Sequence, residues 1–259
     1  MKCKVCGEAA DKYFTARILN KYNADYYLCV KCGFLFANEP SWLNEAYERP
    51  INLEDTGLVF RNIYFARMVS VIIYGCFNGK GKFVDYAGGY GLFTRLMRDN
   101  GFDFFWNDPY CTNLLAAGFE YDEEYDGKIE LVTAFEVLEH LADPSEIEKM
   151  LKLSRNILFS TQILPLPVPQ PDKWWYYGFE HGQHISFYSI ESLKHLAKKH
   201  NLNFYAMSGI YLFTEKKLNM FKLRFLLRIS GFGLLRFIKG RMGSKTEEDH
   251  ERMLKREKV

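Results

Sequence analysis

The segment from Trp174 to Ser189 carries the side chains best suited to proton transfer. It reads WWYYGFEHGQHISFYS and places Glu180, His181 and His184 close together. Histidine exchanges protons near neutral pH, and a neighbouring carboxylate can orient its ring or share its proton. We therefore expect His181 to be a general base that is oriented by Glu180, with His184 as the second candidate. The alternative for His184 is a structural role, in which its ring satisfies polar groups in a buried turn.

Three further side chains are candidates for contact with a substrate. Tyr176 and Tyr177 precede the histidines and offer hydroxyl groups to a polar substrate. His140 follows a predicted strand, where it is expected to serve the fold first and to contact substrate as its second possible role. Prolines at every second position from Pro165 to Pro171 indicate a stiff, extended loop that delivers this segment to the site.

Four of the six cysteines form two matched pairs near the N-terminus. Each pair is a Cys-x-x-Cys-Gly motif, and the four residues are Cys3, Cys6, Cys29 and Cys32. Such a turn points two sulfurs at one place, and two turns complete a tetrahedral Zn²⁺ site. With four protein ligands and no open position, the zinc would be structural and would stabilise a module too short to bury a large core. The alternatives are unrelated thiols or redox pairs. Residues 13–28, between the pairs, alternate as in a short hairpin.

A turn with little side-chain bulk follows the first strand of the predicted catalytic domain. Residues 83–93, FVDYAGGYGLF, lead from apolar residues through Asp85 into Ala87, Gly88, Gly89 and Gly91. Such a turn lets a flat, polar molecule lie against main-chain atoms where a strand ends and a helix begins. The spacing is not the Gly-x-Gly-x-x-Gly of dinucleotide-binding folds, and no phosphate-loop lysine follows. A nicotinamide-dependent oxidoreductase is therefore disfavoured.

An acidic residue ends the second predicted strand. Residues 102–107, FDFFWN, are followed by Asp108 and Pro109, about 20 positions beyond the first strand. A carboxylate at this place can accept hydrogen bonds from both hydroxyls of a ribose. The alternative is a turn residue, because Asp-Pro is a common turn pair. The spacing favours the ribose, and Phe119 and Glu120 are then candidates to border an adenine.

Together these motifs resemble the class I S-adenosylmethionine-dependent methyltransferases, in particular the subgroup acting on small molecules. The resemblance spans residues 83–213. FVDYAGGYGLF is similar to the first motif of the family, Val-Leu-Asp-x-Gly-x-Gly-x-Gly. NDP at residues 107–109 is similar to the acidic end of the second strand, and VTAFEVLEHLADP at 132–144 to the motif of the fourth. Ala87 stands where the family usually has glycine, a change that costs little if φ there is negative.

The resemblance implies both a fold and a cofactor. The fold is α/β, a Rossmann-like, doubly wound, mostly parallel seven-stranded sheet, here preceded by the small zinc-knuckle module. The cofactor is S-adenosylmethionine, whose methionine part would lie against the glycine turn and whose ribose would be held by Asp108. Its methyl-bearing end would lie near Glu136. The implied contacts are Asp85, Ala87, Gly88, Gly89, Gly91, Asp108, Pro109, Phe119, Glu120 and Glu136.

A zinc module before such a domain is also similar to the sugar C-methyltransferases of deoxysugar pathways. These have a Glu-His pair after the fifth strand, and Glu180-His181 stands in the corresponding place. The resemblance implies a nucleotide-linked sugar or a glycan precursor as the acceptor. A function of a different class is a non-catalytic scaffold that binds a protein or nucleic acid through the zinc knuckle and the basic tail.

The 259 residues are predicted to form four consecutive parts. Residues 1–40 form the zinc-binding knuckle module, and residues 41–78 a helical linker or cap. Residues 79–214 form the S-adenosylmethionine-binding methyltransferase domain, and residues 215–259 a basic, aromatic-rich tail. Because no apolar N-terminal signal or uninterrupted membrane-spanning run is found, we expect a cytoplasmic protein with reduced thiols.

The tail concentrates the positive charge of the chain. Residues 215–259 contain 13 Lys and Arg against 6 Asp and Glu, although the formal net charge of the whole chain is only +2. We expect helix that packs on the domain or on a second copy, and contact with an anionic membrane surface ranks second. Nucleic acid is disfavoured, because Gly231 and Gly233 interrupt the helix and the arginines do not share one face. Residues 246–259 are expected to be disordered or a frayed helix.

Overall fold

The computed structural model describes residues 1–51, 55–125 and 127–256. Positions 52–54 of the predicted linker, Asp126 and the tail end at 257–259 lie outside the described residues. The chain divides into two compact units. One comprises Met1–Asn52 and Ala134–Glu215, and the other Leu53–Thr133 and Lys216–Val259. Each unit is therefore assembled from two stretches that are far apart in the sequence.

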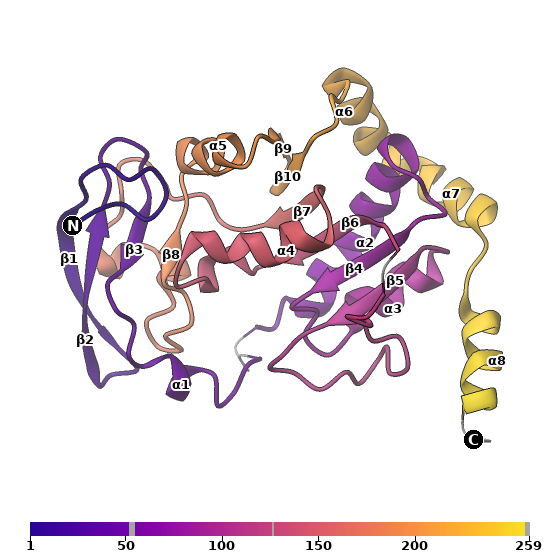
Figure 1. Ribbon diagram of the computed structural model, residues 1–259, viewed down its shortest axis with the longest axis horizontal. Helices are drawn as coiled ribbons and strands as arrows, with labels where there is room; N and C mark the ends of the chain where they lie inside the picture. Colours follow the sequence, from indigo (N-terminus) through magenta and orange to yellow (C-terminus); the bar gives the residue numbers. More distant parts are fainter. Residues whose placement is uncertain (52–54, 126, 257–259) are drawn as a thin grey trace. The chain divides into compact units, whose positions relative to one another are not determined.

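An antiparallel sheet in the first unit holds the N-terminal strands together. Its order is β1 (Asp11–Ile18), β2 (Tyr22–Leu28), β3 (Leu35–Ala37) and β8 (Ser186–Phe187), as Figure 1 shows. Leu19 and Asn20 adopt positive φ at the tip between β1 and β2, as a tight hairpin with the right-handed twist requires. The hairpin predicted between the cysteine pairs is thus confirmed. β8 belongs to the histidine-rich segment, so that segment is an edge strand of the cysteine module's own sheet.

Aromatic side chains form the core against this sheet. Tyr26 and Phe187 are fully buried there together with Tyr176 and Tyr177, and the short helix α1 (Leu43–Ala46) adds Ala46. Residues 161–170, which carry the prolines of the predicted loop, form no helix or strand, as predicted, and two 3₁₀ turns follow, Pro171–Lys173 and Trp175–Tyr177. The same unit contains 3₁₀ turns at Leu138–His140 and Pro144–Glu146, and the helices α4 (Ile147–Leu153) and α5 (Ile190–Lys199).

The other sheet is mixed and mostly parallel. Its order is β5 (Asp103–Asn107), β4 (Lys82–Tyr86), β6 (Ile129–Phe135), β7 (Ile157–Ser160), β10 (Ile210–Thr214) and β9 (Asn203–Met207). β4 is parallel to β5 and β6, whereas β10 is antiparallel to β7 and β9. Residues 129–134 of β6 are all buried, which is typical of a central parallel strand.

The prediction of seven strands is wrong for the described residues, where this sheet has six. Beside β5, where another strand could add, only an isolated bridge joins Trp106 to Glu120. The chain there continues as YDEE, residues 121–124, and acidic residues are unfavourable in strands. The predicted double winding of helices around the sheet stays a prediction.

The second unit is organised around a long helix, α2 (Leu58–Cys76). It packs against α3 (Leu92–Asp99) and against two helices of the tail, α6 (Met220–Ile229) and α7 (Leu235–Met242). The predicted packing of the tail on the domain is thus seen within this unit. A π-helical turn at Ser230–Leu234, with Gly233 at positive φ, separates α6 from α7.

By length and composition α2 is the one described helix that could cross a membrane, and 44% of its most apolar window is buried within the structure. A core helix of a folded domain passes the same test. Phe65, Val69 and Ile72 are among its buried side chains.

Residues 246–256 of the tail form a helix, so the helical alternative holds there rather than the disordered one. In α8 (Thr246–Arg256), Asp249 accepts two hydrogen bonds from the Arg98 guanidinium, at 2.6 and 2.8 Å. Arg98 is only 1% exposed and also donates to Asp103 and to the carbonyl of Phe104, at 2.8 Å each. A buried, bidentate ion pair fixes the helix, because separating it would leave a charge in the core.

Candidate active site

The turn after β4 leaves main chain bare between a strand and a helix. Ala87, Gly89 and Gly91 have φ of 54°, 55° and 83°, and α3 begins at the next residue, Leu92. A Cβ on Gly88 would lie 2.8 Å from Asp85, and one on Gly91 2.5 Å from the Asn113 side chain. Glycine is therefore required at both positions by the close approach of the protein to itself.

Ala87 corrects one expectation, since its φ is positive rather than negative. An L-residue other than glycine is strained in this region by roughly 1–2 kcal/mol. The departure from the family pattern therefore costs stability at the turn.

Asp85 ties the turn to its surroundings rather than facing out of it. Its carboxylate accepts hydrogen bonds from Thr133 at 2.9 Å and from Thr94 at 3.1 Å. Burial raises the pKa of Asp85 to about 7, and the threonine hydroxyls oppose that shift. The side chain thus links β4, β6 and α3.

Asp108 touches the glycine turn directly. One carboxylate oxygen accepts from the Gly89 N–H at 2.9 Å, and the other accepts from the N–H groups of Tyr110 and Cys111 at 2.8 and 3.0 Å. The second set of contacts is the predicted turn role. The first places the carboxylate beside the bare main chain, with lone pairs left for further donors.

Trp106 also contacts the turn, although the sequence analysis did not select it. Its indole N–H donates to the Gly89 carbonyl at 2.8 Å. The available signal was its place in β5 near Asp108, where an aromatic ring can lie along the turn.

The other predicted cofactor contacts of this unit differ in their exposure to solvent. Pro109 is exposed beside the turn. The Phe119 ring is buried beneath the Arg98 guanidinium, 3.8 Å away, and its N–H and C=O are paired with Ala116 and Trp106. Glu120 is exposed and accepts from the Asn113 amide at 2.8 Å. Pro109 and the carboxylate of Glu120 therefore remain near solvent, whereas the Phe119 ring does not.

In the first unit, Glu136 ends β6 with the same backbone shape as Ala87. Its φ is 54°, and its N–H donates to the Ser160 hydroxyl at 3.0 Å. Its carboxylate accepts from Ser160 at 2.5 Å and from the Tyr176 hydroxyl at 3.2 Å. Ser160 and Tyr176 therefore hold the side chain of Glu136 at the end of β6.

Tyr176 also hydrogen-bonds to Glu139, a fully buried carboxyl group that the sequence analysis did not select. Burial and the nearby Glu136 raise the pKa of Glu139 well above its usual value. A phenol has one proton, so a protonated Glu139 can donate to Tyr176 while Tyr176 donates to Glu136. The second carboxyl oxygen of Glu139 is buried without a partner among the described residues.

Two histidine rings lie next to these carboxyl groups. Nδ1 of His184 lies 2.7 Å from the Tyr176 carbonyl, and Nδ1 of His140 lies 2.8 Å from the Tyr47 hydroxyl. Because a carbonyl only accepts, His184 carries its proton on Nδ1 and keeps a lone pair on Nε2. Burial lowers the pKa of His184 to about 3 and that of His140 well below its usual value. Both rings are neutral near pH 7.

His181 joins this group, with its ring centre 4.7 Å from that of His184. Its Nδ1 accepts from the Gln183 N–H at 3.1 Å, and its Nε2 lies where a Cβ on Gly178 would be. Glu180 is exposed. Tyr177 donates to the Pro169 carbonyl at 2.7 Å from within the aromatic core.

The structure therefore brings together some of the predicted catalytic and substrate residues and leaves others apart. Around Tyr176 it gathers the histidine cluster, by which we mean His140, His181 and His184. Glu180 and Tyr177 have no described hydrogen bond to that cluster.

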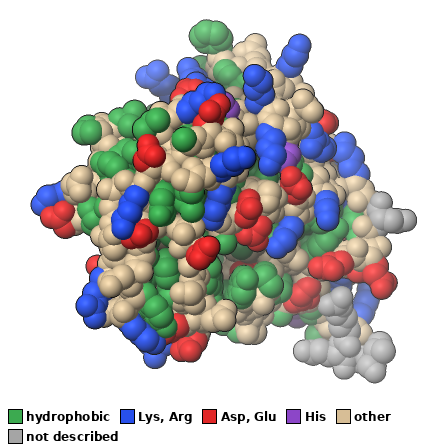
Figure 2. Space-filling model, turned by 60° about the vertical axis from the view of Figure 1, so that its left-hand side comes forward, with side chains coloured by type: hydrophobic (Ala, Val, Ile, Leu, Met, Phe, Trp, Pro, Cys, Tyr) green, Lys and Arg blue, Asp and Glu red, His purple; other side chains and the backbone are tan. Residues whose placement is uncertain are grey.

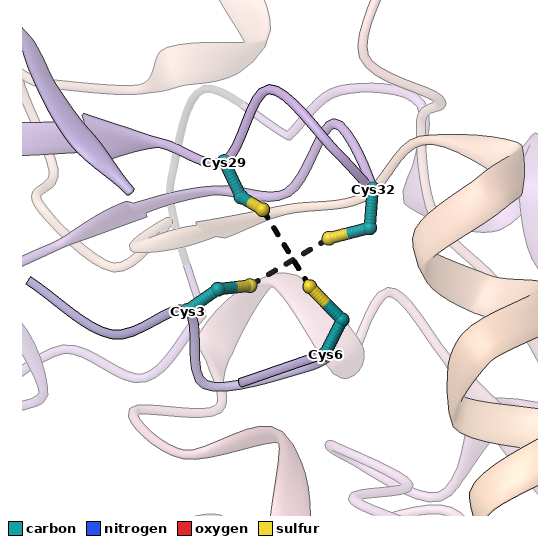
Figure 3. Close-up of side chains that lie close together, drawn as sticks. All are labelled: Cys3, Cys6, Cys29 and Cys32. Carbon is teal, nitrogen blue, oxygen red and sulfur yellow. Dashed lines mark hydrogen bonds between the residues drawn. The ribbon is translucent and has the colours of Figure 1, made fainter. Parts of the chain in front are cut away.

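The four cysteine sulfurs converge on one point (Figure 3). Sγ of Cys3 lies 3.6 Å from Sγ of Cys32, and Sγ of Cys6 lies 3.5 Å from Sγ of Cys29. Tetrahedral zinc with bonds of ~2.3 Å separates its sulfurs by ~3.8 Å. The two Cys-x-x-Cys-Gly turns point their sulfurs at one place, as predicted, and four thiol donors fit zinc.

A methyltransferase-domain family model matches residues 64–206, more than half of the chain, and the protein belongs to that family. It is an S-adenosylmethionine-dependent methyltransferase. A search of curated proteins finds no match in sequence.

Several solved methyltransferase structures are similar to this chain at low sequence identity. A plantazolicin methyltransferase is 13% identical with a TM-score of 0.50, and the match covers 76% of this chain and 86% of that one. Magnesium protoporphyrin IX methyltransferase from Synechocystis PCC 6803 is 14% identical with a TM-score of 0.41, covering 68% and 95%. A methyltransferase of calicheamicin biosynthesis is 14% identical with a TM-score of 0.40, covering 59% of this chain and 54% of its own.

Proposed function

We propose that this methyltransferase acts on a small polar molecule, a nucleotide-linked sugar or a glycan precursor, that binds against the histidine cluster. The observation that carries the proposal is the Nε2 lone pair of His184, whose ring centre lies 4.6 Å from that of Tyr176, the residue that hydrogen-bonds to Glu136 and Glu139. Such a group can accept a hydrogen bond from a hydroxyl-bearing acceptor and orient it, and His181 in the same cluster can take up its proton. S-adenosylmethionine supplies the electrophilic methyl group when bound.

Within the glycine turn, residues 87–91 would lie against the methionine part of the cofactor, and Asp108 would hold its ribose. The support is the bare main chain at the start of α3 and the contact of Asp108 with the Gly89 N–H. Glu120 would border the adenine. In the first unit, Glu136 would face the methyl-bearing end.

Isothermal titration with S-adenosylmethionine tests the cofactor part of the proposal. We expect binding by the full chain and at least tenfold weaker binding by Asp108→Ala. The matched control is Asp11→Ala, at an exposed position of β1. No binding at roughly millimolar ligand would refute the proposal and favour the non-catalytic scaffold.

The acceptor is tested by methyl transfer from labelled S-adenosylmethionine to a panel of nucleotide-linked sugars. Transfer to one member of the panel supports the proposed substrate class. Transfer only to a peptide or a nucleic acid in parallel reactions would refute it.

We also propose that the cysteine cluster holds one structural zinc ion. The support is the convergence of four sulfurs at nearly the separation that tetrahedral zinc requires. A reducing compartment keeps such thiols available for metal, and we propose the cytoplasm as the location.

The outward face of α6 and α7 is proposed to contact an anionic membrane surface. Phe221 and Phe232 are 89% and 86% exposed, and no acidic residue occurs between Lys216 and Lys245. Exposed rings among cations suit the lipid interface, whereas two copies of this face would repel each other in a symmetric dimer. Figure 2 shows one face of the molecule, on which hydrophobic, basic and acidic side chains are interspersed.

Co-sedimentation with vesicles tests this contact. We expect binding to phosphatidylglycerol vesicles and not to phosphatidylcholine vesicles, with loss of binding in Phe221→Ser. The control is Phe60→Ser, an exposed ring on α2. A chain that dimerises in light scattering and ignores both vesicles would refute the membrane and establish the dimer.

A further inference from the structure

Three side chains of the first unit form a second cluster of metal-binding type. One donor atom each from Glu139, His140 and His184 lies within 4.8 Å of the other two. An ion at the centre of such a triangle would be at most ~2.8 Å from each donor, and bound divalent ions lie at 2.0–2.2 Å or so. Shifts of roughly 0.6–0.8 Å per side chain would close the site.

We expect the two histidines to bind the ion through the ring nitrogens that make no local hydrogen bond. Nδ1 of each ring is engaged, by Tyr47 for His140 and by the Tyr176 carbonyl for His184. This leaves Nε2 of both rings, and a hydrogen bond at the opposite nitrogen is the usual way in which a protein orients a metal-binding histidine. The partners at Nδ1 therefore act as supports for ligation through Nε2.

The carboxyl group gives a second, independent indication. Glu139 is fully buried, and its Oε2 has no hydrogen-bond partner among the described residues. Its Oε1 is held by Tyr176. A buried polar atom without a partner costs about 1–3 kcal/mol, and a cation at Oε2 would remove that cost.

We propose that Glu139, His140 and His184 bind a divalent metal ion, distinct from the zinc of the cysteine cluster. Two imidazoles and one carboxylate, formed as the ion displaces the proton of Glu139, are a donor set that suits Mn²⁺, Fe²⁺ or Zn²⁺ and leaves coordination positions open. An open position can take the acceptor's oxygen, which the ion polarises and orients. This last role rests on the proposed function, whereas the binding of the ion does not.

The ion also gives the three histidines of the cluster different roles. His140 and His184 become ligands, and His181 is left as the residue of the cluster that can exchange a proton with the acceptor. The coordinated oxygen needs a weaker base, because the ion lowers the pKa of a bound hydroxyl.

Titration with Mn²⁺, followed by its electron paramagnetic resonance signal, tests the site in the full chain loaded with zinc. Mn²⁺ disfavours thiolate ligands, so the cysteine cluster does not interfere. We expect one Mn²⁺ per chain, and at least tenfold weaker binding in Glu139→Gln and His184→Gln. Glutamine at position 184 can still donate to the Tyr176 carbonyl. The matched controls, Glu191→Gln and His195→Gln on α5, should bind as the unaltered chain does.

Two results would overturn the inference: no Mn²⁺ bound at roughly millimolar concentration, or unchanged affinity in both cluster variants. Zinc content and thermal melting confirm that each variant is folded, and either cluster variant alone suffices for the comparison. The readout needs neither cofactor nor acceptor. A chain that binds Mn²⁺ but not S-adenosylmethionine would therefore support the ion site while refuting the proposed function.

Discussion

Ala87 and Glu136 share a backbone conformation that glycine adopts with least strain. Each follows a strand directly, β4 in one case and β6 in the other, and each has φ of 54°. Strained residues of this kind persist where the surrounding structure holds them, and they concentrate at functional sites. For Ala87 the surrounding structure is the turn of residues 87–91. For Glu136 it is the hydroxyl groups of Ser160 and Tyr176.

We predict that Ala87→Gly stabilises the protein. Glycine removes the strain of a positive φ, so the free energy of unfolding should rise by about 1 kcal/mol in urea denaturation. The control is Ala206→Gly in β9, a strand position without positive φ, where glycine should lower stability. A loss of stability at position 87 would contradict the account of the turn.

His181→Ala is expected to lower kcat by at least about 100-fold while leaving the Kd for S-adenosylmethionine unchanged. The reason is that the ring lies in the histidine cluster and not at the glycine turn. His195→Ala on α5 serves as the control, and both values come from turnover and titration of the same preparations. Activity close to that of the unaltered chain would remove His181 from the mechanism.

At the scale of elements, Asp249 anchors α8 through ion pairs with the buried Arg98 and the partly buried Arg95. Asp249 is 3% exposed and supplies both oxygens to Arg98. Asp249→Ala leaves the guanidinium with Asp103 and one carbonyl, so we expect the free energy of unfolding to fall by about 3 kcal/mol. Glu248→Ala, one residue away with a largely exposed side chain, should change it by less than about 0.5 kcal/mol. Equal effects of the two substitutions in thermal or urea melts would show that the ion pair does not hold the helix.

The elements with a strong local signal could be predicted, and those that depend on distant partners could not. The hairpin of β1 and β2 shows alternation and the run of β6 is apolar, and both follow from sequence. β8 is two residues long and exists because β3 lies beside it. α8 reads as a charged, frayed end until Arg98, about 150 residues earlier, is placed against it.

The residues of the candidate site likewise differ in whether the sequence alone could identify them. The four cysteines could be selected because their spacing alone defines a metal-binding pattern. Glu139 could not, because its significance lies in being buried beside Tyr176 and the rings of His140 and His184. His140 is the sequence neighbour of Glu139, but Tyr176 and His184 follow more than 35 positions later, and no local pattern encodes their proximity.

At the scale of the molecule, loss of zinc should reach beyond the cysteines. β3 follows the second cysteine pair and pairs with β8, and Cys32 accepts a hydrogen bond from Ser189 through its carbonyl. Cys32→Ser should therefore lower the melting temperature and abolish turnover, and zinc content and circular dichroism should fall together. Cys111→Ser, at a lone cysteine, is the control. A Cys32→Ser chain that keeps one zinc and its melting temperature would contradict the structural role.

Each compact unit is completed by chain that is made late. Residues 1–52 find their partners in residues 134–215, and residues 53–133 find theirs beyond position 216. During synthesis, β3 therefore lacks its partner strand until β8 has been made. The apolar face of α2 that packs on α6 and α7 stays uncovered until those helices have left the ribosome. Each unit thus depends on residues that are synthesised after those they pack against, and a chain stalled before position 216 would present that face of α2 to chaperones and proteases.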